Sequence, residues 1–202
     1  MTVAAIRQDS PDRLRVVLEG GEELRSTLGV VTALRLYAGR ELDAEGLEEL
    51  RRESGRALAR ERALTLVSQR QMSAKELRDK LRQKGIEPET ADWCVDWLTE
   101  RGLLDEASYA AAVVRHYAAK GYGAGRVRAE LNRRGLSREL ADEAMETMPD
   151  GQEKIDRLIA ARLRDPGDRD EVRKLSASLY RRGFSSEEIR SALRRFETEI
   201  EE

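Results

Sequence analysis

The chain has 202 residues, of which 38% are charged and 4% aromatic, and its 37 Lys and Arg nearly balance its 39 Asp and Glu. This composition is typical of helices with one solvated face around a core of Leu, Ala and Val, and the small net charge indicates no class of partner. One cysteine, Cys94, excludes an internal disulfide, and a single histidine and cysteine are too few for a zinc site. No apolar run is long enough to span a membrane, and the N-terminus lacks the apolar core of a signal peptide. We therefore expect a cytoplasmic protein without metal, cofactor or membrane partner.

Residues 1–56 are predicted to form an N-terminal extension. Apolar residues alternate along 14–18 ahead of the pair Gly20-Gly21, a pattern that predicts a β-hairpin within the first 28 residues. A short helix is expected at about 30–37. A long helix should then start after Asp43, a favoured N-cap residue, and end near residue 70.

From residue 63 onward the chain repeats itself. Three times, two apolar residues four positions apart are followed, after four more, by a glycine: Gly85, Gly135 and Gly183, which lie 50 and 48 residues apart. Small or apolar residues recur at the same distances after each glycine, and such self-similarity predicts tandem repeats. The predicted fold is mainly α, an elongated, curved solenoid of three-helix units that follows the small N-terminal β-hairpin plus helix. The predicted repeats are 57–105, 106–150 and 151–202.

Each repeat is predicted to contain three helices with recognisable end signals. Ser73 and Ser185, each with Glu three residues later, form capping boxes, and Asp105 and Ser137 are N-cap residues. The repeat glycines suit the left-handed position that ends a helix. The first helices are expected at 63–70, 109–119 and 155–163, the second at 74–84, 126–134 and 171–182, and the third at 88–101, 138–148 and 186–198.

Gly121, Gly123 and Gly125 form a cluster that is peculiar to the middle repeat. A phosphate-binding loop is the wrong interpretation, because Arg126-Val127 follows where Lys-Ser or Lys-Thr would be needed and a helix precedes where a dinucleotide fold needs a strand. The cluster instead predicts a sharp turn and a hinge between the first and second helices of that repeat.

No combination of residues indicates catalysis. Cys94 falls on an apolar repeat position, which favours core packing over reactivity, and His116 lies on a helix with no second histidine. Trp93 and Trp97 share one helix face, where packing between the first two repeats is favoured over a stacking platform for bases. We expect no enzymatic activity.

Charge is distributed unevenly among the predicted helices. The three second helices hold 13 Lys and Arg against four acids, whereas the third helices of the first two repeats are acidic. Because stacked repeats place like helices on like sides, this pattern predicts one basic and one acidic face. The alternative is a solvated surface with scattered ion pairs of little energetic value. A basic stripe favours nucleic acid or an acidic protein groove as the partner.

The stretches SQRQMSAKELRDKLRQKG, LTERGLLDEASYAAAVV and KGYGAGRVRAELNRRGL together resemble the bacterial RecX family, regulators of the RecA recombinase. The resemblance covers about 57–148 and extends, more weakly, to about 196. The most specific part is Gly121-Tyr122-Gly123 followed by Arg126, Glu130, Leu131 and Gly135. The sequence departs from the family pattern at Glu106, where a second aspartate is usual, and at Tyr109, where phenylalanine is common.

The resemblance implies an inhibitor of RecA that lies in the groove of the RecA–single-stranded DNA filament and suppresses ATP hydrolysis and strand exchange in recombination and DNA repair. Its partners would be the filament and single-stranded DNA, contacted directly or through the filament, and we expect a monomer. The hinge at Gly121, Gly123 and Gly125 would let the first two repeats follow the filament pitch. The residues expected to contact RecA or DNA are Lys75, Arg78, Lys80, Arg82, Lys84, Lys120, Tyr122, Arg126, Arg128, Arg133, Arg134, Arg173, Lys174, Arg181 and Arg182.

Two other classes fit the same residues. A basic helical DNA-binding protein would bind naked DNA tightly and with a steep dependence on salt. A helical protein–protein scaffold would bind no nucleic acid at all.

Overall fold

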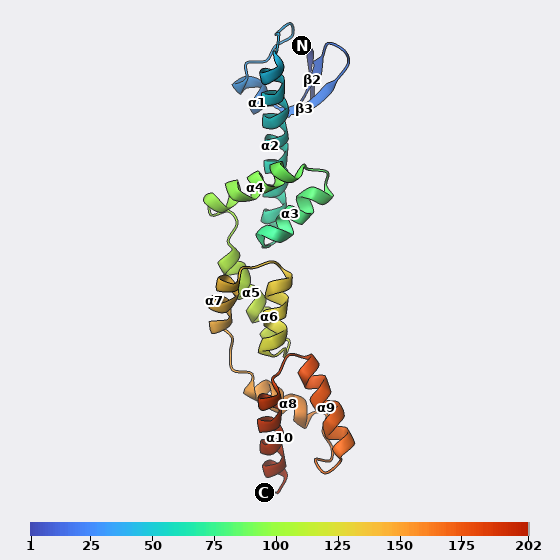
Figure 1. Cartoon of the computed structure of the whole chain (residues 1–202), viewed down its shortest axis with the longest axis vertical. Coiled ribbons are helices and arrows are strands. Elements are labelled where there is room, and N and C mark those ends of the chain that lie inside the picture. The colour runs from blue at the N-terminus through green and yellow to red at the C-terminus, as the bar shows by residue number, and fades with distance from the viewer. Residues whose placement is uncertain (202) are drawn as a thin grey trace. The chain divides into compact units, whose positions relative to one another are not determined.

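The computed structural model describes residues 1–201, with side chains to residue 198, and forms two compact units that meet in sequence between Leu104 and Asp105 (Figure 1). Its described part contains ten helices and three short strands. The expected mainly α class is therefore confirmed, and so are the three tandem three-helix repeats and a small N-terminal β element.

The N-terminal β element is a three-stranded antiparallel sheet and not a lone hairpin. Strands β1 (Val3–Ser10), β2 (Arg13–Leu18) and β3 (Glu23–Thr27) lie in that order, and Gly20-Gly21 forms the predicted turn between β2 and β3 with both φ angles positive. Strand β1 was missed because its apolar residues, VAAI, do not alternate with polar ones. One face of the sheet packs on the N-terminal half of the long helix beside it (Figure 1).

Two helices follow the sheet. Helix α1 (Leu28–Ala33) begins and ends earlier than expected, because the Thr27 hydroxyl accepts the Val30 N–H at its start and Arg35 adopts a positive φ just beyond its end. Helix α2 (Ala44–Gln69) matches the prediction, and the Asp43 carboxylate accepts the Gly46 N–H at 2.7 Å. The boundary predicted after residue 56 lies inside α2, so one helix serves both the extension and the first repeat.

The three repeats each have a separate apolar core. The first comprises the end of α2 with α3 (Ala74–Gln83) and α4 (Pro88–Glu100). The second comprises α5 (Glu106–Ala119), α6 (Ala124–Arg133) and α7 (Arg138–Glu146). The third comprises α8 (Gln152–Ala160), α9 (Arg169–Arg181) and α10 (Ser186–Glu201). The apolar pairs that revealed the period are buried in all three cores: Leu77 and Leu81, Val127 and Leu131, Leu175 and Leu179.

The repeat glycines end the second helix of each repeat. Gly85, Gly135 and Gly183 have φ of 78°, 76° and 92°, the left-handed region in which a side chain is strained. In each case the next residue donates its N–H back to the carbonyl of the second apolar residue of the pair, at 3.2 or 3.3 Å. This is the Schellman arrangement that satisfies the last carbonyls of a helix.

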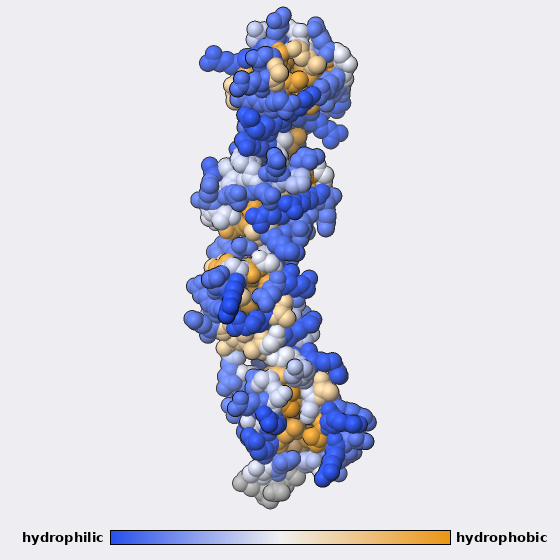
Figure 2. All heavy atoms as spheres, in the orientation of Figure 1, coloured by the Kyte–Doolittle hydropathy of each residue, from blue (hydrophilic) through white to orange (hydrophobic). Residues whose placement is uncertain are grey.

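Hydrophilic residues cover most of the visible face of each unit, and apolar residues show in smaller patches among them (Figure 2). Within the part of the chain that the structure describes, no helix combines the length and the apolar character needed to cross a bilayer.

Candidate nucleic-acid interface

Acidic third helices neutralise part of the basic second helices. On α3, Arg78 lies 2.8 Å from Asp92 of α4, and Arg82 lies 3.3 Å from the same carboxylate. On α6, Arg128 pairs with Asp142 of α7. The charge reversal seen in the sequence thus produces ion pairs along the seams between second and third helices, in place of a wholly separate acidic face.

Arg133 and Arg134 surround a buried carboxylate. Glu130 is 4% exposed and lies 2.6 Å from Arg133 and 2.7 Å from Arg134. The hydrogen bond from Arg133 is the main cause that lowers the pKa of Glu130 to about 2, helped by Arg134 and Tyr117 against the opposing effect of burial. Arg134, only 20% exposed, also donates to the Tyr109 hydroxyl. Arg134 therefore serves the core of the second repeat more than its surface.

Half of the fourteen predicted cationic contact residues remain without an ion pair among the described side chains. Lys75 and Arg173 pair with acids on their own helices. The other paired residues are Arg78, Arg82, Arg128, Arg133 and Arg134. The unpaired residues are Lys80, Lys84, Lys120, Arg126, Lys174, Arg181 and Arg182.

Gly123 and Gly125 bring the second repeat into backbone contact with the third. The Gly123 N–H donates to the Arg182 carbonyl and the Gly125 N–H donates to the Gly183 carbonyl, both at 2.9 Å. A Cβ on Gly123 would lie 2.4 Å from the Gly183 oxygen, a distance that real Cβ atoms do not tolerate. Glycine is required here because two backbones touch, which is a different reason from a turn.

Gly121 has the role expected of a turn. Its φ of +75° ends α5, and the next N–H, of Tyr122, donates to the Tyr117 carbonyl at 3.2 Å. The hinge that was predicted to move the first two repeats stays a prediction. The contacts of Gly123 and Gly125 concern the second and third repeats and give these glycines a role that the prediction did not include.

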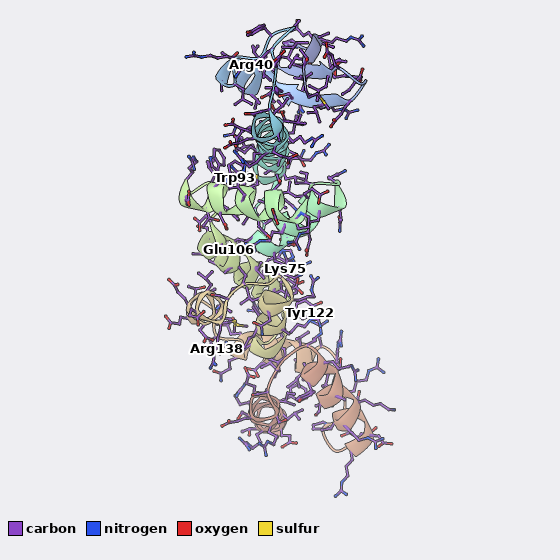
Figure 3. All side chains as sticks on the ribbon, turned by 45° about the horizontal axis from the view of Figure 1, so that its top comes forward. Arg40, Lys75, Trp93, Glu106, Tyr122 and Arg138 are labelled. Carbon is purple, nitrogen blue, oxygen red and sulfur yellow. The ribbon has the colours of Figure 1, made fainter. Side chains whose placement is uncertain are left out.

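Three of the unpaired cations, Arg126, Arg181 and Arg182, lie at this contact, and a fourth, Lys120, directly precedes Gly121 in the sequence. Arg182 places its guanidinium 5.9 Å from the centre of the Tyr122 ring, and its carbonyl accepts the Gly123 N–H. Arg126 abuts Gly183, whose Cβ would lie 2.2 Å from the Arg126 nitrogen. Lys120 and Arg181 adjoin Gly121 and Arg182 in sequence, and Figure 3 shows Tyr122 at the link between α5 and α6. We call Lys120, Tyr122, Arg126, Arg181 and Arg182 the junction site.

Sequence reasoning missed two residues next to the junction site. Tyr180 is 65% exposed on α9, and Arg190 is exposed on α10. The sequence did carry a signal for Tyr180, because Lys174, Ala177 and Arg181 recur around it at helical spacing. The structure shows that all three of these residues are exposed.

The tryptophans pack inside the first unit. Guanidiniums lie over their rings: Arg56 of α2 is 4.6 Å from the Trp93 ring centre, Arg60 is 5.5 Å from that of Trp97, and Arg101 is 4.3 Å from that of Trp97. Both rings are half-buried on α4, where Figure 3 labels Trp93. The pairs with Arg56 and Arg60 brace α4 against α2, so the tryptophans pack within the first repeat and not, as predicted, between the first two repeats.

The described residues offer no metal cluster, since no group of three His, Cys, Asp or Glu side chains converges. Cys94 is buried, and burial raises the pKa of its thiol to about 11, which keeps it protonated and unreactive at neutral pH. His116 is exposed on α5.

Comparison with known proteins places the repeats in one family. Residues 59–98, 105–145 and 150–193 match the first, second and third three-helix domains of RecX. A "Regulatory protein RecX" of Xanthomonas oryzae pv. oryzae (strain MAFF 311018) is 44% identical over 137 residues, which cover 66% of this chain and 86% of that protein. One from Stenotrophomonas maltophilia (strain R551-3) is 42% identical and is covered over 84% of its length.

Solved structures share the fold. A crystal structure of regulatory protein RecX superimposes with a TM-score of 0.71 at 23% identity, over 93% of this chain and 96% of that one. RecX from Lactobacillus salivarius gives a TM-score of 0.63 at 22% identity, over 71% and 97% of the two chains. Three consecutive family domains and a relative at 44% identity show that the chain belongs to the RecX family of regulatory proteins.

Proposed function

We propose that the chain regulates a RecA recombinase by binding the RecA–single-stranded DNA filament in its groove and suppressing ATP hydrolysis and strand exchange. Family membership supports a regulator. The observation that carries the proposal is the group of unpaired cations at the junction site, in a chain whose formal net charge is only −2. In a nearly neutral protein, a local group of unpaired arginines favours an anionic partner at that place.

The groove of a nucleoprotein filament offers phosphates to such a site. Contacts between arginine and phosphate release condensed counterions, so binding should weaken steeply as salt rises. Lys80 and Lys84, at the end of α3, supply a second unpaired group in the other unit. Two groups on one chain raise the effective concentration of the second contact once the first has formed.

Binding that spans neighbouring RecA subunits would favour one arrangement of them, and a ligand that favours one state opposes the rearrangements needed for ATP turnover. In this proposal the unpaired cations make the direct contacts. Arg78, Arg82 and Arg128 must first break their ion pairs with aspartates, so each contributes less to filament binding than an unpaired cation does.

The test measures ATP hydrolysis by RecA of the same organism on single-stranded DNA while this protein is titrated in. Inhibition well below one molecule per RecA is expected. Arg126→Gln should weaken inhibition and reduce the slope of log affinity against log salt by about 1, the value for one lost phosphate contact. Arg128→Gln is the matched control, because it removes the same charge from the same helix but from a residue paired with Asp142.

Three outcomes would contradict the proposal. An unchanged ATPase rate, with filaments shown to form, would exclude the inhibitor. Tight binding to naked duplex DNA, with no preference for the filament, would indicate a plain DNA-binding protein. Equal effects of the two arginine substitutions would remove the junction site from the contact surface.

A further inference from the structure

We propose that the groove beside the junction site is a base-stacking site for single-stranded nucleic acid, in which Tyr180 stacks on a base while Arg126, Arg181 and Arg190 bind the flanking phosphates. The inference rests on the proposed function, because it names the chemistry by which the C-terminal unit would hold the strand inside the filament.

Tyr180 stands between two hollows. One, of about 540 Å³, lies between α6 and the turn from α9 to α10, and the other, of about 420 Å³, lies between α9 and α10. Tyr180, Arg181 and Ser186 line both. Among the described residues the Tyr180 ring has no hydrogen bond and no stacked aromatic or guanidinium partner, so its faces are available. An exposed aromatic ring without a packing role is the feature that sequence-tolerant binding of single strands requires.

Small residues line the side of the groove opposite Tyr180. Ala124, Gly125 and Ala129 of α6 line it opposite Tyr180, and Ala177 lines the second hollow. The Gly125 N–H bonded to the Gly183 carbonyl fixes this side of the groove relative to α9. Small side chains on a fixed backbone leave room for a flat base to lie against the ring.

The charge around the groove is positive. Arg126 and Arg181 form no ion pair among the described residues, and neither does Arg190, whose guanidinium donates only to the Ser186 carbonyl of its own helix at 3.1 Å. Glu188 is the one carboxylate among the lining residues, and it accepts the Ser185 N–H at 2.6 Å as part of the cap of α10. Three free guanidiniums around one ring match a base flanked by phosphates.

A protein segment fits the same groove less well. Of the three large apolar residues that line the hollows, Phe184 and Ile189 are 2% and 4% exposed and Leu193 is half-buried, so they offer little side-chain surface to an apolar anchor. Protein interfaces depend on buried anchors of that kind. A stacked base needs only the exposed ring.

The experiment measures fluorescence anisotropy of the full chain with two labelled oligonucleotides of equal length, oligo-dT and an abasic strand with the same phosphates. Tyr180→Ala should weaken dT binding by about tenfold, the usual order for one lost stacking contact, and leave abasic binding within twofold. Tyr180→Trp should restore dT binding. Tyr37→Ala, which removes another exposed tyrosine at 62% exposure in the other unit, should change neither.

Several results would overturn the inference. The Tyr180→Ala chain would bind dT as tightly as the unmodified chain, or would lose as much affinity for the abasic strand as for dT. The Tyr180→Trp chain would fail to bind dT, or the unmodified chain would not bind dT even at low salt. Loss of binding to RecA filaments by Tyr180→Ala, with dT binding intact, would assign the groove to a protein segment. Because Tyr180 is exposed, each variant should fold, and a circular dichroism melt that matches that of the unmodified chain confirms it.

Failure of the proposed function would show separately, as an unchanged rate of ATP hydrolysis by RecA when the unmodified chain is added.

Discussion

Two arginines that lie two residues apart on α6 have different roles. Arg126 is exposed and unpaired beside Gly183, whereas Arg128 pairs with Asp142 and Arg134, just beyond the helix, pairs with buried Glu130. The difference is the acid that the fold brings near each one. Availability for a partner therefore depends on the third helix of the repeat as much as on the second.

Glu130→Gln should destabilise the second repeat by roughly 2–3 kcal/mol at neutral pH, because it leaves the mostly buried Arg134 without its charge partner. The pKa of Glu130 is lowered in the folded protein to about 2, so the stability it contributes is fully present above its unfolded pKa near 4.5. That stability is lost as pH falls from about 4.5 toward 2. Urea unfolding of both proteins from pH 7 to pH 3 measures this.

The unfolding free energies of the unmodified chain and of Glu130→Gln should differ by a constant amount above pH 5 and converge below pH 4. A difference that stays constant down to pH 3 would show that the carboxylate charge is not what stabilises the repeat. Glu139→Gln, on the exposed start of α7, is the control and should change stability little at any pH.

The link between α5 and α6 joins two repeats through their backbones. Gly123 has an ordinary φ of −78°, so no conformational reason requires glycine there. The requirement comes from the carbonyl of Gly183 at the end of α9. Gly123 of the second repeat is thus required by the backbone of Gly183, which lies sixty residues later in the third repeat.

Gly123→Ala should destabilise the C-terminal unit by roughly 1–3 kcal/mol, since its Cβ meets backbone that cannot move away without breaking the two N–H to carbonyl bonds. Gly55→Ala is the matched control: no atom lies within 4 Å of its Cβ, and in the middle of α2 alanine should stabilise by about 0.5–1 kcal/mol. Thermal unfolding by circular dichroism measures both. A Gly123→Ala protein as stable as the unmodified chain would mean that the two repeats do not hold this contact in solution.

The helices could be predicted because their signals are local. Ser73, Asp43 and Pro88 start helices where the sequence indicated, and the repeat glycines end them. Strand β1 could not be predicted, since it is specified by pairing with β2, for example Ile6 opposite Val16, and not by its own pattern. The junction site was predicted only in part. Lys120, Tyr122 and Arg126 were named from their link, but their meeting with Arg182 depends on tertiary contacts that no local pattern encodes.

The chain contains a series of small apolar cores. The four apolar clusters each lie within one unit: two between residues 3 and 104, and two between residues 109 and 192. Helix α2 continues from the sheet cluster, where Leu50 is buried, to the cluster of the first repeat, where Ala63 is buried. A core of this size is sensitive to the loss of a single large side chain.

Leu77→Ala should therefore destabilise only the N-terminal unit and Ile159→Ala only the C-terminal one, each by about 2–5 kcal/mol, because both side chains are fully buried in different clusters. Hydrogen exchange read by mass spectrometry separates the two. Leu77→Ala should speed exchange in peptides from α3 and α4, Ile159→Ala in those from α8 and α10, and the double substitution should add the two patterns. If either substitution speeds exchange equally in both units, the described chain unfolds cooperatively, and the two compact units are not independent in stability.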